Sequence, residues 1–349
     1  MIIIKPKINF ILLISVISAG VSLFAFPEIT LEGAKSGVDI CLNSLIPSLF
    51  PFMALSTFIM RTDALYILSK LFGKVTKCLF LLPQNAGQII FMSLIGGYPV
   101  GAKLTADALK SGEITENEAK RLCIFCMNAG PAFTVTALGV NIYGNIKAGI
   151  IIYISLCMSS VIIGVLTRFL ADGKSVIQIN KTERNFSADD ITFSVWDAFE
   201  ATLRICAWVI LFSAFMACVT VKFGKSGEFL GAVAEVTAGT VTVSKICPIP
   251  VVTALCGFGG FCVHCQVLKY IKQCSLPYKL FFVGRILNSA ISAALCHIIL
   301  YYFPIEQNVS YTFESASVSA ISVSLPTVIA FIFMCVTMVL NIEKKGKVC

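Results

Sequence analysis

Charged residues are scarce in this sequence of 349 residues, since Asp, Glu, Lys and Arg make up 13% of it and hydrophobic residues make up 57%. An ordinary soluble domain carries about 25% charged residues, so the composition excludes a soluble globular protein. Segments of alternating hydrophobicity, which a transmembrane β-barrel requires, are also missing. The composition therefore predicts an all-α polytopic membrane protein.

Histidine is rare as well, with two in the chain, and the 15 cysteines are irregularly spaced and lie mostly within apolar blocks. A zinc site needs paired ligands at regular spacing, so we expect free thiols, no metal and no cofactor. No motif brings a nucleophile and a base together or cradles a phosphate, so we expect no enzymatic activity. The net charge of +8 comes from Lys and Arg at the ends of apolar blocks. We therefore expect no nucleic-acid partner.

What the sequence does contain is a series of apolar blocks of about 20 residues, the length that crosses a bilayer. They predict spans at 8–26, 38–60, 122–140, 146–170, 195–221, 280–303 and 318–340. Two further apolar segments, 87–109 and 248–271, are interrupted by glycine or proline. The segment 65–82 carries Lys70, Lys74 and Lys77 on one helical face, which is typical of an interfacial or re-entrant helix.

These segments divide the chain into five parts. They are an N-terminal transmembrane helix (1–30), a first half (31–170), a cytoplasmic linker (171–193), a second half (194–303) and a C-terminal transmembrane helix with a basic tail (304–349). Lysines near both ends predict that the N- and C-termini are cytoplasmic. The first apolar block also fits a signal peptide, although it is long for one.

The two halves are predicted to repeat one unit. Asn128 and Asn288 are 160 positions apart, and so are Gly97 and Gly257. In each half an interrupted apolar segment leads through a polar turn to the segment that bears the asparagine. Chance similarity between apolar helices is the alternative, and the sequence leaves open whether the repeat is inverted or parallel. Repeats that are interrupted at matching positions mark the binding site in many transporters.

The first interruption has the sequence Gly96-Gly97-Tyr98-Pro99-Val100-Gly101. Proline lacks an N–H group and disfavours helix at the residue before it. We expect a half-helix that starts near Val100, whose first N–H groups and positive dipole end bind an anion. Lys103 adds a full positive charge nearby. The structural alternative is a kink packed against a neighbouring helix.

The second interruption contains Gly257, Gly259 and Gly260, with His264 near the position that corresponds to Lys103. Glu235 lies in a small-residue-rich apolar segment, where an ionisable residue indicates function by default. It suits a proton, a cation or a hydroxyl-rich substrate, and the alternative is a solvated loop. The candidate substrate-binding residues are Gly97, Tyr98, Pro99, Gly101, Lys103, Asn128, Glu235, Thr237, Gly259, Gly260, His264, Arg285 and Asn288.

Four strings of sequence carry a resemblance to a known family. They are Asn43 to Phe52 (NSLIPSLFPF), Gly96 to Lys103 (GGYPVGAK), Asn128 to Phe133 (NAGPAF) and Glu235 to Gly239 (EVTAG). With them the sequence resembles the YlbJ-type sporulation integral membrane proteins, also called stage V sporulation protein V, in the group with nucleoside-recognition (Gate) domains. The likeness extends over roughly residues 31–303.

The resemblance implies a role in forming endospores, namely transport of dipicolinic acid across the outer forespore membrane. It also implies a fold distantly like that of concentrative nucleoside transporters. We therefore expect a transporter of a small carboxylate, with dipicolinate and the lipid bilayer as partners. A coupling ion, H+ or Na+, and a homo-oligomer are left open. The alternatives are a nucleoside or nucleobase transporter, and a sporulation membrane scaffold that transports nothing.

Overall fold

The structure is a computed structural model that describes residue 20 and residues 24–61, 64–172 and 188–305. Most of the expected first span, the expected last span and both termini lie outside the described residues. Every regular element that is described is helical. Within the described residues, five helical segments are long and apolar enough to cross a membrane: Pro27–Ile59, Ile146–Leu170, Asp189–Val221, Ile249–Gln273 and Tyr278–Tyr302. The expectation of an all-helical membrane protein is thus confirmed.

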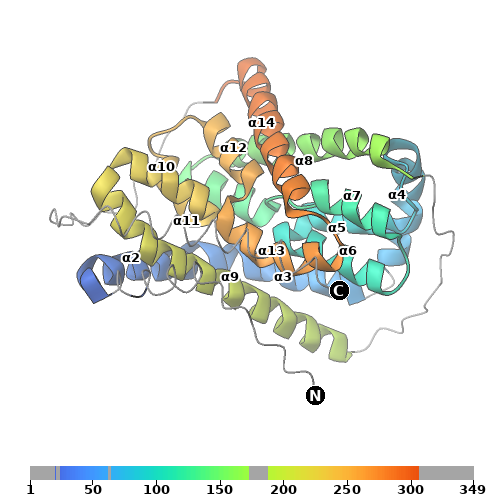
Figure 1. Cartoon of the computed structure of the whole chain (residues 1–349), viewed down its shortest axis with the longest axis horizontal. Helices are drawn as coiled ribbons and strands as arrows, with labels where there is room; N and C mark the ends of the chain where they lie inside the picture. The colour runs from blue at the N-terminus through green and yellow to red at the C-terminus, as the bar shows by residue number, and fades with distance from the viewer. Residues whose placement is uncertain (1–19, 21–23, 62–63, 173–187, 306–349) are drawn as a thin grey trace, which may run out of the picture.

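Two long helical rods run along one side of the molecule (Figure 1). The first consists of α2 (Pro27–Ile40), a π-helical turn (η1, Cys41–Leu45) and α3 (Ile46–Arg61), and the second is α9 (Ala188–Phe223). Both α2 and α3 pack against α9. Gly33 and Gly37 face α9 so closely that a Cβ atom would meet its backbone. At 1.5 Å per residue, α9 is about 54 Å long, well beyond the roughly 30 Å of a bilayer core. It begins inside the segment that was expected to be a linker.

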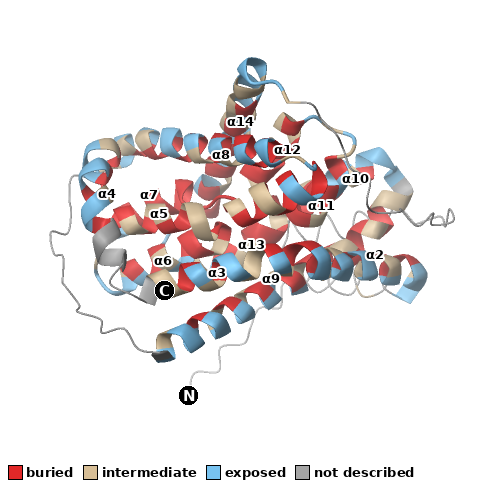
Figure 2. Cartoon of the chain, turned by 180° about the vertical axis from the view of Figure 1, so that it is seen from behind, coloured by how far each residue is buried: buried red, intermediate tan, exposed pale blue. Residues whose placement is uncertain are grey.

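The remaining helices form a compact body beside these rods. They are α4 (Ala64–Phe80), α5 (Ala86–Gly96), α6 (Tyr98–Lys110), α7 (Glu116–Phe125), η2 (Ala132–Ile142), α8 (Ile146–Leu166), η3 (Thr167–Leu170), α10 (Lys225–Ala234), α11 (Val236–Val243), α12 (Ile249–Phe258), α13 (Gly260–Gln273) and α14 (Tyr278–Tyr302). The broken helices lie at the buried centre, and α4, α8 and α9 present exposed outer faces (Figure 2). On α4 the three lysines Lys70, Lys74 and Lys77 are exposed together with Leu71, as expected of an interfacial face.

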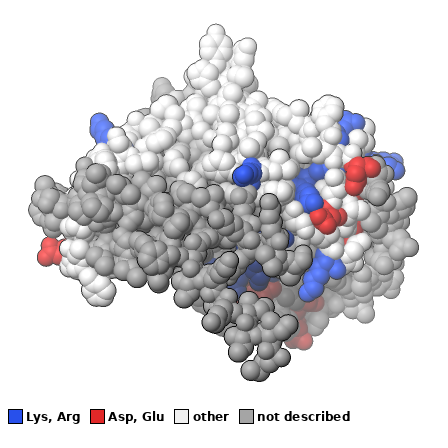
Figure 3. All heavy atoms as spheres, in the orientation of Figure 1, with Lys and Arg blue, Asp and Glu red and all other residues white. Residues whose placement is uncertain are grey.

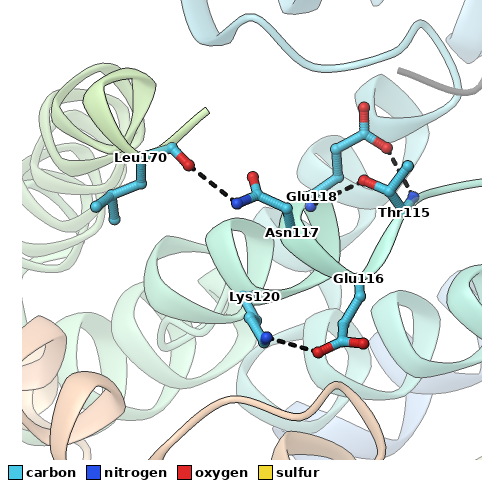
Figure 4. A network of polar contacts seen from close by, with 6 residues as sticks. All are labelled: Thr115, Glu116, Asn117, Glu118, Lys120 and Leu170. Carbon is cyan, nitrogen blue, oxygen red and sulfur yellow. Dashed lines mark hydrogen bonds and ion pairs between the residues drawn. The ribbon is translucent and has the colours of Figure 1, made fainter. Parts of the chain in front are cut away.

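On the face drawn in Figure 3 most described side chains carry no charge, and the charged ones gather mainly towards the end of the molecule where α4 to α7 lie. The polar turn between α6 and α7 lies where these two helices meet (Figure 1), and Figure 4 shows its polar contacts. Thr115 and Glu118 form a reciprocal capping box at the start of α7. Lys120 donates a hydrogen bond of 2.6 Å to Glu116 and thereby lowers the pKa of that exposed carboxyl. Such caps begin a helix at a defined residue, and this one fixes where α7 starts.

Candidate functional site

The first expected helix break is present. Gly97 separates α5 from α6 with φ 81° and ψ −170°, a conformation that is essentially reserved for glycine. The new helix begins at Tyr98, two residues earlier than expected, with proline in its first turn. Gly101, one turn further on, lies against the carbonyl oxygen of Cys126, where no Cβ would fit. The glycines therefore both end α5 and let α6 approach the end of α7.

The second expected break separates α12 from α13. Gly259 has φ 86° and Gly260 has φ 68°, so two consecutive residues adopt conformations that other residues rarely take. A Cβ atom on Gly260 would lie 2.8 Å from the backbone nitrogen of Val236. The break is thus tied to the start of α11.

Two further interruptions went unrecognised in the sequence. The expectation of a continuous span over 122–140 is wrong, because α7 ends at Phe125 and the chain is irregular through Gly130 before η2 begins at Ala132. Gly130-Pro131 explains this, since proline prevents continuation of the helix and glycine permits a turn. The other interruption is at Glu235, which has an extended backbone between α10 and α11.

All four interruptions meet in one row. Gly260 lies against Val236, next to Glu235, and Gly259 lies against the ring of Tyr98. At the far end of the row, a Cβ atom on Gly97 would be 3.4 Å from the backbone nitrogen of Gly130. Because irregular backbone at membrane depth is tolerated only within protein or beside a cavity, it is significant that this chain collects it in one place.

Arg285 of α14 binds the backbone at two of these interruptions. Its Nε donates to the carbonyl oxygen of Phe258 at 3.2 Å, and its two terminal nitrogens donate to the carbonyl oxygens of Gly257 and Met127. The guanidinium group also lies over the Tyr98 ring, 5.9 Å from its centroid. Arg285 is 1% exposed, and no described carboxylate forms an ion pair with it. The carbonyl end of α12, which is the negative end of its dipole, offsets part of this charge. Each terminal nitrogen retains a second N–H group.

The two asparagines that define the predicted repeat touch each other. Asn288 Nδ2 donates to Asn128 Oδ1 at 2.7 Å, and Ser159 Oγ donates to Asn288 Oδ1 at 2.6 Å. Asn128 in turn donates to Ser160. Both asparagines are 1% exposed. The sequence did not reveal Ser159 and Ser160, although two consecutive serines within the apolar block 146–170 were a usable signal.

Tyr98 and His264 belong to the same region but have fixed partners. The Tyr98 hydroxyl donates to the carbonyl oxygen of Cys256 at 2.5 Å, which joins the first break to the second. His264 Nδ1 lies 2.9 Å from the Tyr278 hydroxyl, and its Nε2 lies 3.1 Å from the carbonyl oxygen of Phe258. Aromatic rings surround the imidazole, among them Phe258 and Phe281. Both ring nitrogens are therefore engaged within the protein.

Not every expected site residue lies in this cluster. Lys103 is exposed on α6, so its proposed contact with an anion stays a prediction. Glu235 is 2% exposed, which excludes a solvated loop. Its two carboxylate oxygens accept hydrogen bonds from the backbone N–H groups of Thr237 at 2.9 Å and Ala238 at 2.6 Å. Glu235 thus caps α11 at the end of the row of interruptions, and Thr237 contributes through its backbone.

The chain is similar to a known sporulation protein over most of its length. The chain is 24% identical over 337 residues to the "Sporulation integral membrane protein YlbJ" of Bacillus subtilis (strain 168), and the match covers 82% of each protein. No family model matches the sequence. No solved structure matches the chain either. The helical spans, the interrupted helices and this match together identify the chain as an integral membrane protein homologous to the sporulation protein YlbJ.

Proposed function

We propose that this protein transports a small carboxylate, dipicolinic acid, across the outer forespore membrane during sporulation. The observation that carries the proposal is the buried Arg285 at the meeting point of the interrupted helices, with carbonyl groups but no described carboxylate around it. The identity of the substrate rests on the resemblance to the YlbJ-type family.

The depth of the cluster supports a transport site. Asn288 is ten positions after Tyr278, the first residue of a span of 25 residues, so it lies about 15 Å along the helix. That is close to the middle of a bilayer core of about 30 Å. Substrate sites of transporters lie near this depth, at discontinuous helices.

The chemistry of Arg285 favours an anion. A guanidinium group binds a carboxylate through two parallel N–H bonds, and such charge-assisted bonds are stronger than bonds to neutral carbonyl groups. An entering dianion can therefore replace the carbonyl groups of Gly257 and Met127 as acceptors. Gly257 belongs to α12 and Met127 follows α7, so Arg285 holds these two interrupted helices together. Once the anion has replaced both carbonyl groups, the two helices are free to separate.

The order of helices supports the proposed repeat. An interrupted pair of helices, α5 and α6, precedes the interrupted α7–η2 segment that carries Asn128. The interrupted pair α12 and α13 likewise precedes α14, which carries Asn288. The segments differ in that α14 is continuous. A repeat of this kind would supply two matching halves around one site, which is the usual design of a transporter that opens alternately to each side.

Uptake by the purified protein in proteoliposomes tests the function. We expect saturable uptake of labelled dipicolinate, with protein-free vesicles as the control. Labelled uridine, assayed in the same vesicles, addresses the nucleoside alternative. Accumulation of uridine without dipicolinate would replace the proposal by nucleoside transport, and accumulation of neither would favour a scaffold.

A further inference from the structure

Glu235 also lines a cleft that the proposed anion site does not explain. Its volume is about 650 Å³, and it lies between α2, α9, α10 and α11, with Glu235 among its lining residues. The wall formed by α2 has a polar stripe of Glu32, Lys35, Ser36 and Asp39. Lys35 and Ser36 each lie three or four residues from both Glu32 and Asp39, the spacing of one helical face. The spacing of these four residues is visible in the sequence and could have revealed the stripe.

The charges along the cleft are predominantly acidic. The described titratable and charged groups that face Glu235 or line the cleft are Glu32, Lys35 and Asp39 of α2, Cys41 of η1, Tyr98 of α6, Glu228 of α10 and Lys245 after α11, whereas α9 adds only uncharged side chains. Four carboxylates, including Glu235, thus face two lysines. A cleft of this kind concentrates cations rather than anions.

Two polar groups that line the cleft, Ser213 and Glu235, have unused bonding capacity. The Ser213 hydroxyl oxygen lines the cleft, is buried and has no hydrogen-bond partner among the described residues. A carboxylate has about four acceptor positions. The N–H groups of Thr237 and Ala238 occupy one on each oxygen of Glu235, and the Thr237 hydroxyl also interacts with the carboxylate, which leaves at least one position free. Glu235 has no ion pair with a described basic side chain. A buried carboxylate without a cationic partner is stabilised by taking up a proton.

From these observations we propose that Glu235 binds a proton that reaches it through the cleft. Protonation of Glu235 weakens the cap that it forms at the start of α11, so that α11 can move relative to α10. The proton adds to one carboxylate oxygen and no other bond is made or broken covalently. The N–H bonds from Thr237 and Ala238 then lose their charge-assisted component. The start of α11 packs against Gly260, and the adjacent Gly259 packs against Tyr98, over which Arg285 lies. A movement of α11 is therefore transmitted to the proposed anion site. This inference rests on the proposed function, and it makes transport proton-dependent.

Uptake of labelled dipicolinate into proteoliposomes, with and without a pH gradient, tests the coupling. For the wild-type protein we expect a gradient of one pH unit to raise uptake by up to about tenfold, since one pH unit is about 1.36 kcal/mol per proton. Glu235→Gln should bring the ratio of the two uptake rates close to one, and Glu235→Asp should keep it above one. Glu118→Gln is the matched control, because Glu118 is also a buried carboxylate that caps a helix but does not line the cleft. A gradient effect that survives in Glu235→Gln, or a sodium gradient that drives uptake instead, would overturn the inference.

Labelling of the wild-type protein by dicyclohexylcarbodiimide gives a readout that needs neither a variant nor transport. This reagent modifies protonated carboxyl groups in apolar surroundings. We expect mass spectrometry to find the label on Glu235, increasing as the pH falls. Labelling of Glu32 or Glu228 without Glu235 would contradict the inference. If the wild-type protein transports no dipicolinate but Glu235 is labelled in this way, the proposed function fails and proton binding stands.

Discussion

Replacing Arg285 by lysine should destabilise the protein more than the same replacement at Arg121. Both arginines are buried and donate to backbone carbonyl groups, but Arg121 serves the adjacent carbonyls of Phe80 and Leu81. Arg285 serves carbonyls in two different interrupted helices. Lysine retains the charge at each position, so the contrast isolates the shape of the guanidinium group.

The magnitude follows from the number of bonds lost. A single ammonium group cannot reach Met127 on one side and the end of α12 on the other, so Arg285→Lys loses about two bonds and Arg121→Lys about one. Hydrogen bonds between membrane helices contribute about 0.6 kcal/mol on average, and bonds to charged groups in soluble proteins about 1.5–3 kcal/mol. The expected loss is therefore about 1–6 kcal/mol for Arg285→Lys, and about half of that for Arg121→Lys.

Thermal unfolding in detergent, followed with a thiol-reactive fluorophore, measures the difference. The protein suits this assay because Cys123, Cys256, Cys262 and Cys274 are fully buried and become reactive when it unfolds. We expect Arg285→Lys to unfold at the lowest temperature, with Arg121→Lys between it and the wild type. If Arg285→Lys unfolds at the wild-type temperature, or Arg121→Lys is the less stable variant, Arg285 does not hold the interrupted helices together.

Three further predictions use the same unfolding assay. Gly97→Ala should lower the free energy of unfolding by about 1–3 kcal/mol, because the backbone conformation of Gly97 is reserved for glycine. Gly112→Ala, at an open turn with φ 76°, should lower it by less, and equal losses would contradict the reasoning. Asn288→Leu should lower the free energy of unfolding by about 1–3 kcal/mol, because the hydrogen-bond partners of Asn288 are left unpaired. The double variant with Asn128→Leu should lose less stability than the sum of the two single variants, and additive losses would show that the two side chains do not interact. Tyr98→Phe should cost about 0.5–1.5 kcal/mol through the lost hydroxyl bond, and an unchanged stability would indicate that this bond is not formed.

The sequence predicted what depends on local chemistry. Pro99 and its flanking glycines specify a helix break wherever they occur, so the break at Gly97 could be placed to within two residues. The same reasoning applied to Gly130-Pro131 would have located the third interruption, but its apolar surroundings were interpreted as a continuous span. For Glu235 the sequence left function within the membrane and a solvated loop as alternatives, and its burial in the structure decides against the loop.

What the sequence could not predict depends on tertiary contacts. Lys103 and Arg285 are both basic residues in helices near a break, and only the packing of α6 and α14 decides that the first is exposed and the second buried. The carbonyl groups that Arg285 binds come from positions 127, 257 and 258, and no local pattern joins them. The contact between Asn128 and Asn288 was suggested only indirectly, by their equal positions in the two halves.

Equilibrium binding of labelled dipicolinate to the purified protein tests most directly whether the buried guanidinium group is the anion site. We expect the wild-type protein and Arg121→Lys to bind one dipicolinate per chain. Arg285→Lys should bind it at least about tenfold more weakly, because lysine lacks the paired donors that match a carboxylate. Undiminished binding by folded Arg285→Lys, or no binding by the wild-type protein, would contradict the account.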